Sequence, residues 1–228
     1  MSTVQIKPWQ HDLGHHVVGG SVYAVKPSLR VAAAVQLRDA GCRVHADIIL
    51  GPDHRHRGVS LDELTAIRRA APTARVDLHL IVLGTQQDPA ALAEERRTIQ
   101  TAIDIGVDFI TVSQSRRELH QPMLAAARAA GIGLWLEVPP DSPGPDAPDT
   151  AAVDGALVML IEPGTKQSAN LGHLEKVRRL APQLPVAVDG GVTRTIAALC
   201  VDLGARYTIS GRDLFSLTQP SPDNTDKD

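Results

Sequence analysis

The fold of this chain is decided by one stretch, Arg43-Val44-His45-Ala46-Asp47-Ile48-Ile49. Apolar residues occupy alternate positions in it, which is typical of a buried strand. His45 and Asp47 are two residues apart, so in a strand both side chains lie on the same face. On a buried face, a histidine beside a carboxylate is costly unless the two are hydrogen-bonded, ion-paired or bound to a metal ion.

Two further stretches have the same character. They are Val76-Asp77-Leu78-His79-Leu80 and Val186-Ala187-Val188-Asp189-Gly190-Gly191. Each places a side chain that can bind a metal near the end of a predicted buried strand. The candidate ligands from the three stretches are His45, Asp47, His79 and Asp189. Two imidazoles and two carboxylates suit a divalent first-row metal, so a metal site is expected if these four side chains meet.

The composition is that of an ordinary globular protein. The chain has 228 residues, of which 43% are hydrophobic, and a formal net charge of −3. This length fits one α/β barrel domain with a large core. The weak negative charge gives no reason to expect nucleic acid or an anionic membrane as a partner.

Cysteine usage and the absence of long apolar runs predict a cytoplasmic protein. Cys42 and Cys200 lie in apolar runs without a CxxC neighbour, so buried, reduced thiols are expected. The N-terminus has no positively charged start followed by an apolar segment, and no unbroken apolar run reaches about 18 residues. Neither secretion by that route nor a membrane span is expected.

Short apolar runs and amphipathic segments alternate along the chain. The predicted strands cover residues 17–24, 42–49, 75–82, 108–113, 134–138, 155–161, 185–189 and 206–210. The predicted helices cover residues 28–40, 88–104, 116–130, 170–181 and 193–203. One more helix is expected after Ser60-Leu61-Asp62-Glu63, which has the pattern of a capping box. The proline-rich stretch 139–148 leaves little room for a helix after the fifth strand.

Eight strands with helices between them predict an α/β fold, a (β/α)8 TIM barrel. In such a barrel the chemistry lies at the carboxyl ends of the strands, and the four candidate ligands fall in the latter halves of theirs. An open doubly wound sheet is the alternative, but no G-x-G-x-x-G follows the first strand. The expected organisation is a polar, irregular lead-in at 1–16, the barrel at 17–217 and a disordered tail at 218–228.

From about Val18 to Phe215 the sequence resembles the ribulose-phosphate 3-epimerase family. The family's H-x-D-x-M-D-G motif is matched by His45–Gly51, its D-x-H-L-M by Asp77–Ile81 and its V-D-G-G-I by Val188–Val192. An echo of M-x-V-N-P-G occurs at 159–164, and the serine of A-P-S falls on Ser21. All four candidate ligands occupy the family's ligand positions, in order.

The resemblance implies a phosphate-binding barrel with one divalent metal ion, which could be zinc, iron, manganese or cobalt. It implies that Asp47 and Asp189 are acid and base on opposite faces of a ketose phosphate, by default converting D-ribulose 5-phosphate to D-xylulose 5-phosphate. One aspartate would remove the C3 proton and the other would return it from the opposite face, through a cis-enediolate whose charge the metal offsets. A homo-oligomer, dimer or hexamer, is implied as well.

The phosphate is expected on backbone N–H groups in the loops after the seventh and eighth strands, where glycines allow close approach. The residues expected to bind substrate are Ser21, Gly164, Gly190, Gly191, Gly211 and Arg212. Turn geometry alone is the alternative role of these glycines, but their place after the seventh and eighth strands favours phosphate or another anion.

Several loops depart from the family pattern, and the departures concern the substrate more than the metal. The family's M-D-G is replaced by Ile49-Leu50-Gly51, its P-G-F-G-G-Q loop by 163–167 and its G-S-A-x-F by 211–215. Lys166 or Arg212 can then meet the anion directly, or both can be solvent-facing charges. A different sugar phosphate, or a larger phosphorylated or nucleotide-linked sugar, is therefore an alternative substrate.

Other polar residues have two interpretations each. Glu137 and Glu162 are predicted to point toward the mouth, and Asp77 to orient His79 or to cap its strand. His54 and His56 can touch substrate or belong to a polar loop. An aldolase or decarboxylase of the same superfamily is disfavoured because the third strand lacks their D-x-K-x-x-D pattern. A non-catalytic barrel that binds a sugar phosphate is the remaining rival.

Overall fold

A closed barrel of eight parallel strands forms the centre of the molecule. The structure is a computed structural model that describes residues 3–51, 56–84, 89–144, 152–165 and 167–218. The barrel strands are β2 (Val18–Ser21), β3 (Arg43–Leu50), β4 (Val76–Val82), β5 (Phe109–Val112), β6 (Gly133–Val138), β7 (Gly155–Met159), β8 (Val186–Asp189) and β9 (Tyr207–Ser210). They are hydrogen-bonded in chain order, and β9 closes the barrel onto β2. The predicted (β/α)8 barrel is confirmed.

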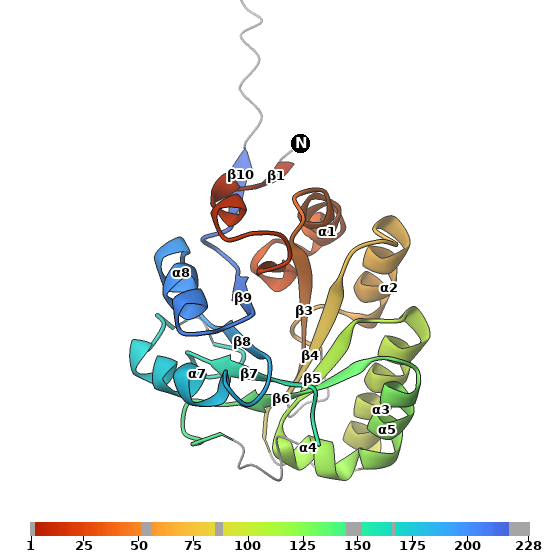
Figure 1. Ribbon diagram of the computed structural model, residues 1–228. Coiled ribbons are helices and arrows are strands. Elements are labelled where there is room, and N and C mark those ends of the chain that lie inside the picture. The colour runs from red at the N-terminus through yellow and green to blue at the C-terminus, as the bar shows by residue number, and fades with distance from the viewer. Residues whose placement is uncertain (1–2, 52–55, 85–88, 145–151, 166, 219–228) are drawn as a thin grey trace, which may run out of the picture.

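Helices surround the barrel on the outside (Figure 1). They are α1 (Arg30–Asp39), α2 (Leu61–Ala70), α3 (Pro89–Ile105), α4 (Gln114–Leu119), α5 (Gln121–Ala129), α7 (Leu174–Leu180) and α8 (Arg194–Asp202). Short 3-10 helices are η1 (Pro8–Asp12), η2 (Val22–Ala24), η3 (Pro27–Leu29) and η4 (Leu171–His173). None of the described helices combines the length and the apolar character that crossing a bilayer requires.

Local sequence signals explain where two of these helices begin. The predicted capping box starts α2: the Ser60 hydroxyl accepts a hydrogen bond from the Glu63 N–H, and the Glu63 carboxylate accepts one from the Ser60 N–H. The single helix expected at 116–130 is two helices, α4 and α5. Pro122 lies in the first turn of α5 and has no N–H to continue the hydrogen bonding of α4. The proline-rich stretch lies partly outside the described residues.

The lead-in contains a strand, so the prediction of an irregular segment is wrong there. β1 (Thr3–Ile6) pairs antiparallel with β10 (Phe215–Thr218), and the two lie side by side outside the barrel (Figure 1). Val4 is buried in the main core. β1 is only four residues long and its partner is more than 200 residues away, so no local pattern reveals it. The division into lead-in, barrel and tail stays a prediction, and residues 219–228 lie outside the described part.

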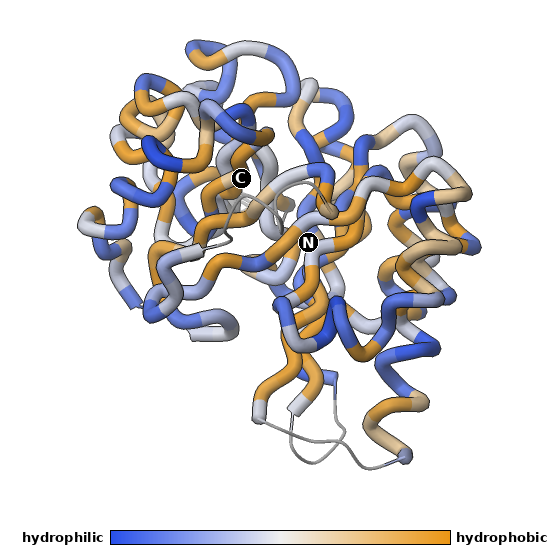
Figure 2. The backbone as a smooth tube through the Cα atoms, turned by 60° about the horizontal axis from the view of Figure 1, so that its bottom comes forward, coloured by the Kyte–Doolittle hydropathy of each residue, from blue (hydrophilic) through white to orange (hydrophobic). Residues whose placement is uncertain are grey.

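Two apolar layers hold the barrel together. The larger one lies between strands and helices, where Leu37 of α1, Leu64 of α2 and Ile99 of α3 are fully buried. In Figure 2 the adjacent carboxyl-terminal parts of β3 and β4 are continuously hydrophobic, whereas the helices alternate between hydrophobic and hydrophilic segments. Strands buried on both faces and helices buried on one face give this pattern.

The smaller layer fills the barrel interior. Its residues are Phe109, Trp135, Leu157, Met159, Ala187, Tyr207 and Ile209, which alternate along their strands with residues of the outer layer. The rings of Phe109 and Trp135 stack with centroids 4.4 Å apart. Gly155 makes room for them, because a Cβ on it would lie 2.4 Å from Cε2 of Trp135. This aromatic packing leaves the carboxyl end of the barrel for polar side chains.

Replacing Gly155 by alanine should destabilise the protein, because the added methyl group would overlap the Trp135 ring. We expect the free energy of unfolding to fall by about 1–3 kcal/mol, which is typical of overpacking in a core. Urea denaturation would measure it. In a Trp135→Leu background the same change should cost much less, because the overlap is gone. Equal losses in both backgrounds would contradict this account of the interior.

Candidate active site

The structure brings the four predicted ligands together at the carboxyl end of the barrel. The β3–β4 register sets Asp47 beside His79, and Asp189 is the last residue of β8. One ligand atom from each of His45, Asp47, His79 and Asp189 lies within 4.8 Å of every other. Side chains from three strands therefore converge on one point.

The atoms that face this point have the chemistry of metal ligands. His45 Nε2 lies 3.1 Å from Asp47 Oδ1 and 3.9 Å from Asp189 Oδ2. His79 Nδ1 lies 3.4 Å from Asp47 Oδ1, yet it is buried and has no hydrogen-bond partner. Buried polar atoms are normally satisfied, so this nitrogen suits a bound ion. Two imidazole nitrogens with carboxylate oxygens can hold a divalent first-row metal.

Each histidine is oriented by a second carboxylate behind it. His45 Nδ1 is 2.5 Å from Asp77 Oδ2, and His79 Nε2 is 2.7 Å from Glu137 Oε2. Such partners fix the tautomer and the ring orientation of a metal-binding histidine. As a result His45 presents Nε2 to the centre and His79 presents Nδ1.

This arrangement corrects the prediction that Asp77 orients His79. Asp77 lies directly opposite His45 in the β3–β4 register, which brings cross-strand side chains into contact. Glu137 of β6, two strands away from β4, orients His79 instead. Glu137 was predicted to point toward the mouth; its carboxylate contacts His79, and it is not among the residues that line the cavity described below.

Burial and neighbouring charges shift the pKa values of the two aspartates in opposite directions and raise that of His79. Burial alone would raise the pKa of Asp47, but the charge and hydrogen bond of His45 hold it well below the usual range. For Asp189 burial dominates and raises the pKa to about 6, although the charge of His45 opposes it. Burial alone would lower the pKa of His79, but the interactions with Asp47 and Glu137 raise it to about 9. Without a metal ion, the imidazolium groups balance the carboxylates.

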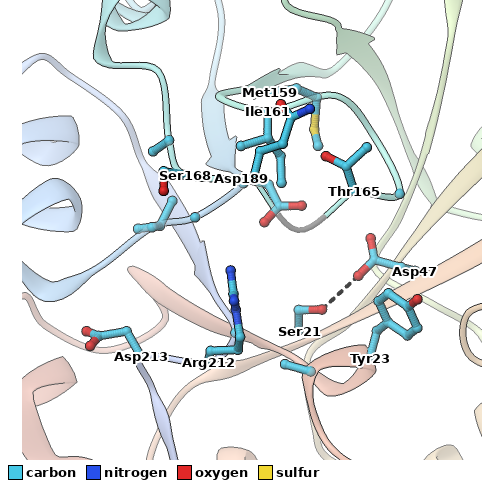
Figure 3. Close-up of a pocket in the computed structure, with 18 of the residues that line it drawn as sticks. Ser21, Tyr23, Asp47, Met159, Ile161, Thr165, Ser168, Asp189, Arg212 and Asp213 are labelled. Carbon is cyan, nitrogen blue, oxygen red and sulfur yellow. Dashed lines mark hydrogen bonds between the residues drawn. The ribbon is translucent and has the colours of Figure 1, made fainter.

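A cavity of about 590 Å³ lies beside the four ligands. Asp47 and Asp189 line it, and their side chains are 8% and 15% exposed. His45 and His79 do not line it, and their side chains are 1% and 0% exposed. Figure 3 shows the two carboxylates pointing toward one another in the same space. Only the aspartates can therefore touch both an ion and a molecule in the cavity.

All residues predicted to bind substrate line this cavity: Ser21, Gly164, Gly190, Gly191, Gly211 and Arg212. The Ser21 hydroxyl donates a hydrogen bond of 2.7 Å to Asp47 Oδ2 (Figure 3). Gly190 and Gly191 have φ values of +102° and +68°, and a Cβ on Gly190 would lie 2.7 Å from the Ile161 side chain. Only glycine fits this turn between β8 and α8. Arg212 points into the cavity in Figure 3.

Sequence reasoning missed other residues of the wall. They include Tyr23, Thr165, Ser168, Leu171, Ile196 and Asp213. The sequence offered one indication of them: they lie in or beside the segments that follow β2, β7, β8 and β9, and barrel enzymes carry their active sites in such segments. Asp213 Oδ2 accepts a hydrogen bond of 3.0 Å from the N–H of Arg194, the first residue of α8.

The remaining sequence candidates lie elsewhere. His56 Nε2 contacts the Glu94 carboxylate on α3, and neither His56 nor Glu162 lines the cavity. Lys166 and His54 lie outside the described residues.

Comparison with known proteins agrees with this geometry. The model of the ribulose-phosphate 3-epimerase family matches residues 39–215. A ribulose-phosphate 3-epimerase of Schizosaccharomyces pombe is 26% identical over 149 residues, which are 63% of this chain and 61% of the relative. The cytoplasmic isoform from Oryza sativa subsp. japonica is 26% identical over 183 residues, 78% of this chain and 77% of the relative. The chain thus spans about three fifths of the yeast relative's length and more of the rice protein's.

Among solved structures, a mutant tryptophan synthase alpha-subunit from Pyrococcus furiosus superposes with a TM-score of 0.61. The alignment covers 86% of this chain and 87% of that one at 16% identity, which is a likeness of fold alone. The family model, by contrast, covers most of the barrel, including all four candidate ligands and the glycines of the cavity. It confirms the resemblance predicted from the motifs: the chain belongs to the ribulose-phosphate 3-epimerase family.

Proposed function

We propose that this protein is a metal-dependent epimerase that inverts C3 of a ketose phosphate, by default converting D-ribulose 5-phosphate to D-xylulose 5-phosphate. One observation carries the proposal: Asp47 and Asp189 belong both to the ligand cluster and to the cavity wall, whereas the histidines are sealed behind them. A protein that only binds a sugar phosphate has no need for two carboxylates in that double position. Family membership supports the same conclusion.

The two aspartates are the proposed acid and base. They come from β3 and β8, so they approach the cavity from different parts of the barrel wall and can address opposite faces of one substrate carbon. One carboxylate takes the C3 proton, and the other, as a carboxylic acid, returns a proton from the opposite face. In the reverse reaction the roles are exchanged. The Ser21 hydrogen bond holds the Asp47 carboxylate in position.

The metal site serves this chemistry. A divalent ion held by His45, Asp47, His79 and Asp189 would supply Lewis-acid stabilisation of negative charge on the substrate oxygens. Asp77 and Glu137 keep the two imidazoles turned toward the centre.

The loops after β8 and β9 form the proposed anion site in the cavity wall. Gly190, Gly191 and Gly211 bring backbone to the cavity surface near the start of α8, and Arg212 adds a cation. However, Asp213 already accepts the Arg194 N–H at the first residue of α8. This observation favours a second candidate: an epimerase of the same family for a sugar with a different or larger anionic group, phosphorylated or nucleotide-linked.

Asparagine in place of either proposed catalytic aspartate should strongly slow proton exchange at C3. We expect Asp47→Asn and Asp189→Asn to lower the exchange rate by roughly 100- to 10,000-fold, the usual contribution of a positioned acid or base. NMR in D₂O would follow the loss of the C3 proton of ribulose 5-phosphate and the appearance of xylulose 5-phosphate. Asp104→Asn, which changes an exposed carboxylate on α3, is the control. Exchange at the wild-type rate in both active-site variants would refute the mechanism.

If the wild-type protein holds one metal ion but exchanges no C3 proton of ribulose 5-phosphate, the default substrate is wrong. The same NMR assay with larger phosphorylated and nucleotide-linked sugars then tests the second candidate. Exchange with none of them would leave a binding protein.

Metal binding should strengthen as the pH rises toward 9. In the metal-free protein the pKa of His79 is raised to about 9 and that of His45 is raised well above its usual value, so both rings carry protons at neutral pH. An ion that takes their lone pairs must displace these protons. Below about pH 9, Kd should therefore fall roughly tenfold for each unit by which the pH rises and for each proton that the ion displaces. Calorimetric titration with Zn²⁺ in two buffers of different ionisation enthalpy would count them, and a Kd that does not change with pH would contradict this charge balance.

Replacing Arg212 by methionine should weaken substrate binding without slowing proton transfer. The guanidinium points into the cavity where the anion is proposed to bind, and Arg212 is not one of the two groups that transfer the proton, so we expect KM to rise roughly 10- to 100-fold while kcat stays the same. Steady-state kinetics would separate the two constants. Arg206→Met, at an exposed position outside the cavity, is the matched control. An unchanged KM would show that Arg212 does not meet the anion.

A further inference from the structure

A buried carboxylate joins the metal site to the opposite end of the barrel interior. Asp77 is 0% exposed, and its two oxygens have different partners. Oδ2 meets His45 Nδ1, whereas Oδ1 accepts a hydrogen bond of 3.0 Å from the Tyr207 hydroxyl and lies 3.6 Å from Arg43 Nε. The carboxylate of Asp77, which orients His45, is thus itself held by Tyr207 and Arg43 through its other oxygen.

Arg43 supplies a permanent counter-charge to Asp77. Its side chain is 11% exposed, and its guanidinium lies 4.8 Å from the centre of the Phe109 ring and 5.1 Å from that of Tyr207. A guanidinium between aromatic faces is well placed and always charged. A buried carboxylate is costly without such a partner. The other edge of Arg43 faces a cavity of about 760 Å³ at the amino end of the barrel, beside Asp108.

Tyr207 reaches Asp77 from the other side of the barrel. Its hydroxyl extends from β9 to β4, past β2 and β3. Gly19 on β2 makes this possible, since a Cβ there would lie 2.1 Å from the Tyr207 oxygen. Because Gly19 has no side chain, there is room for the Tyr207 hydroxyl to reach Asp77.

A histidine that binds a metal through Nε2 must keep its proton on Nδ1 and needs an acceptor for it. Asp77 Oδ2 is that acceptor, and it stays in place only while Oδ1 is held. We propose that Arg43 and Tyr207 are positioning residues that lock Asp77, and through it the ring of His45, in the orientation that binds the divalent ion. The inference rests on the metal site of the proposed function and assigns part of its affinity to residues that touch neither ion nor substrate.

Co²⁺ binding to the metal-free protein tests the inference without any assay of activity. Competition with a chromophoric chelator gives Kd, and the visible spectrum of bound Co²⁺ reports the ligand geometry. We expect Arg43→Met and Tyr207→Phe each to weaken Co²⁺ binding roughly 10- to 100-fold and to alter the spectrum, as loss of an outer partner of a metal ligand does. In an Asp77→Asn background, neither change should have a further effect.

The control is Arg75→Met. Arg75 lines the same cavity at the amino end as Arg43, but it pairs with Asp108 and its side chain is 55% exposed. Its loss should leave Kd and spectrum unchanged. Circular dichroism establishes that each variant is folded. If Arg43→Met does not fold, Tyr207→Phe, which removes one oxygen atom, carries the test alone.

A folded Arg43→Met or Tyr207→Phe protein with wild-type Kd and spectrum would overturn the inference and leave the proposed epimerase activity untouched. Conversely, a wild-type protein that binds Co²⁺ but exchanges no C3 proton of ribulose 5-phosphate or of any larger sugar tested would refute the epimerase activity, while the Co²⁺ comparison would still decide the roles of Arg43 and Tyr207.

Discussion

His45 contacts a carboxylate with each of its ring nitrogens, Asp77 on one side and Asp47 on the other, and the barrel interior is built around that arrangement. Charges inside a core persist only as members of a balanced set. Here the set extends from Arg43 at the amino end, through Asp77 and His45, to the aspartates in the cavity wall. The polar interior at the carboxyl end of the barrel is tolerated because these charges balance.

The parallel register of the strands places these charged side chains next to one another, where they form the site. Residues two apart on β3 face inward one above another, and the neighbouring strand β4 sets its own polar residues directly beside them. Stacked aromatic rings fill the interior and leave the carboxyl end to the polar groups. The histidines are covered and only the aspartates are left accessible, which separates ion binding from contact with a substrate.

Strand and ligand positions were predictable because they depend on local periodicity. A period of two places His45 and Asp47 on one face whatever lies around them. The partner of Asp77 was not predictable, because it depends on the register between strands, which no local pattern encodes. Arg43 has the same phase as His45, but an arginine at a strand's start is normally exposed. Its burial depends on Asp77 and on the rings of Phe109 and Tyr207, which come from other strands.

The pairing of β1 with β10 has a consequence for how the molecule is assembled. The Lys7 N–H binds the Leu214 carbonyl, and Lys7 pairs with Asp213, next to Arg212 in the cavity wall. During synthesis β1 is made before β10, so it has no strand partner until more than 200 further residues have been made. Contacts between such distant segments close late in folding. The wall that carries Arg212 is therefore completed only when β10 pairs with β1, so a chain that still lacks β10 has an unfinished cavity even where its metal ligands are all present.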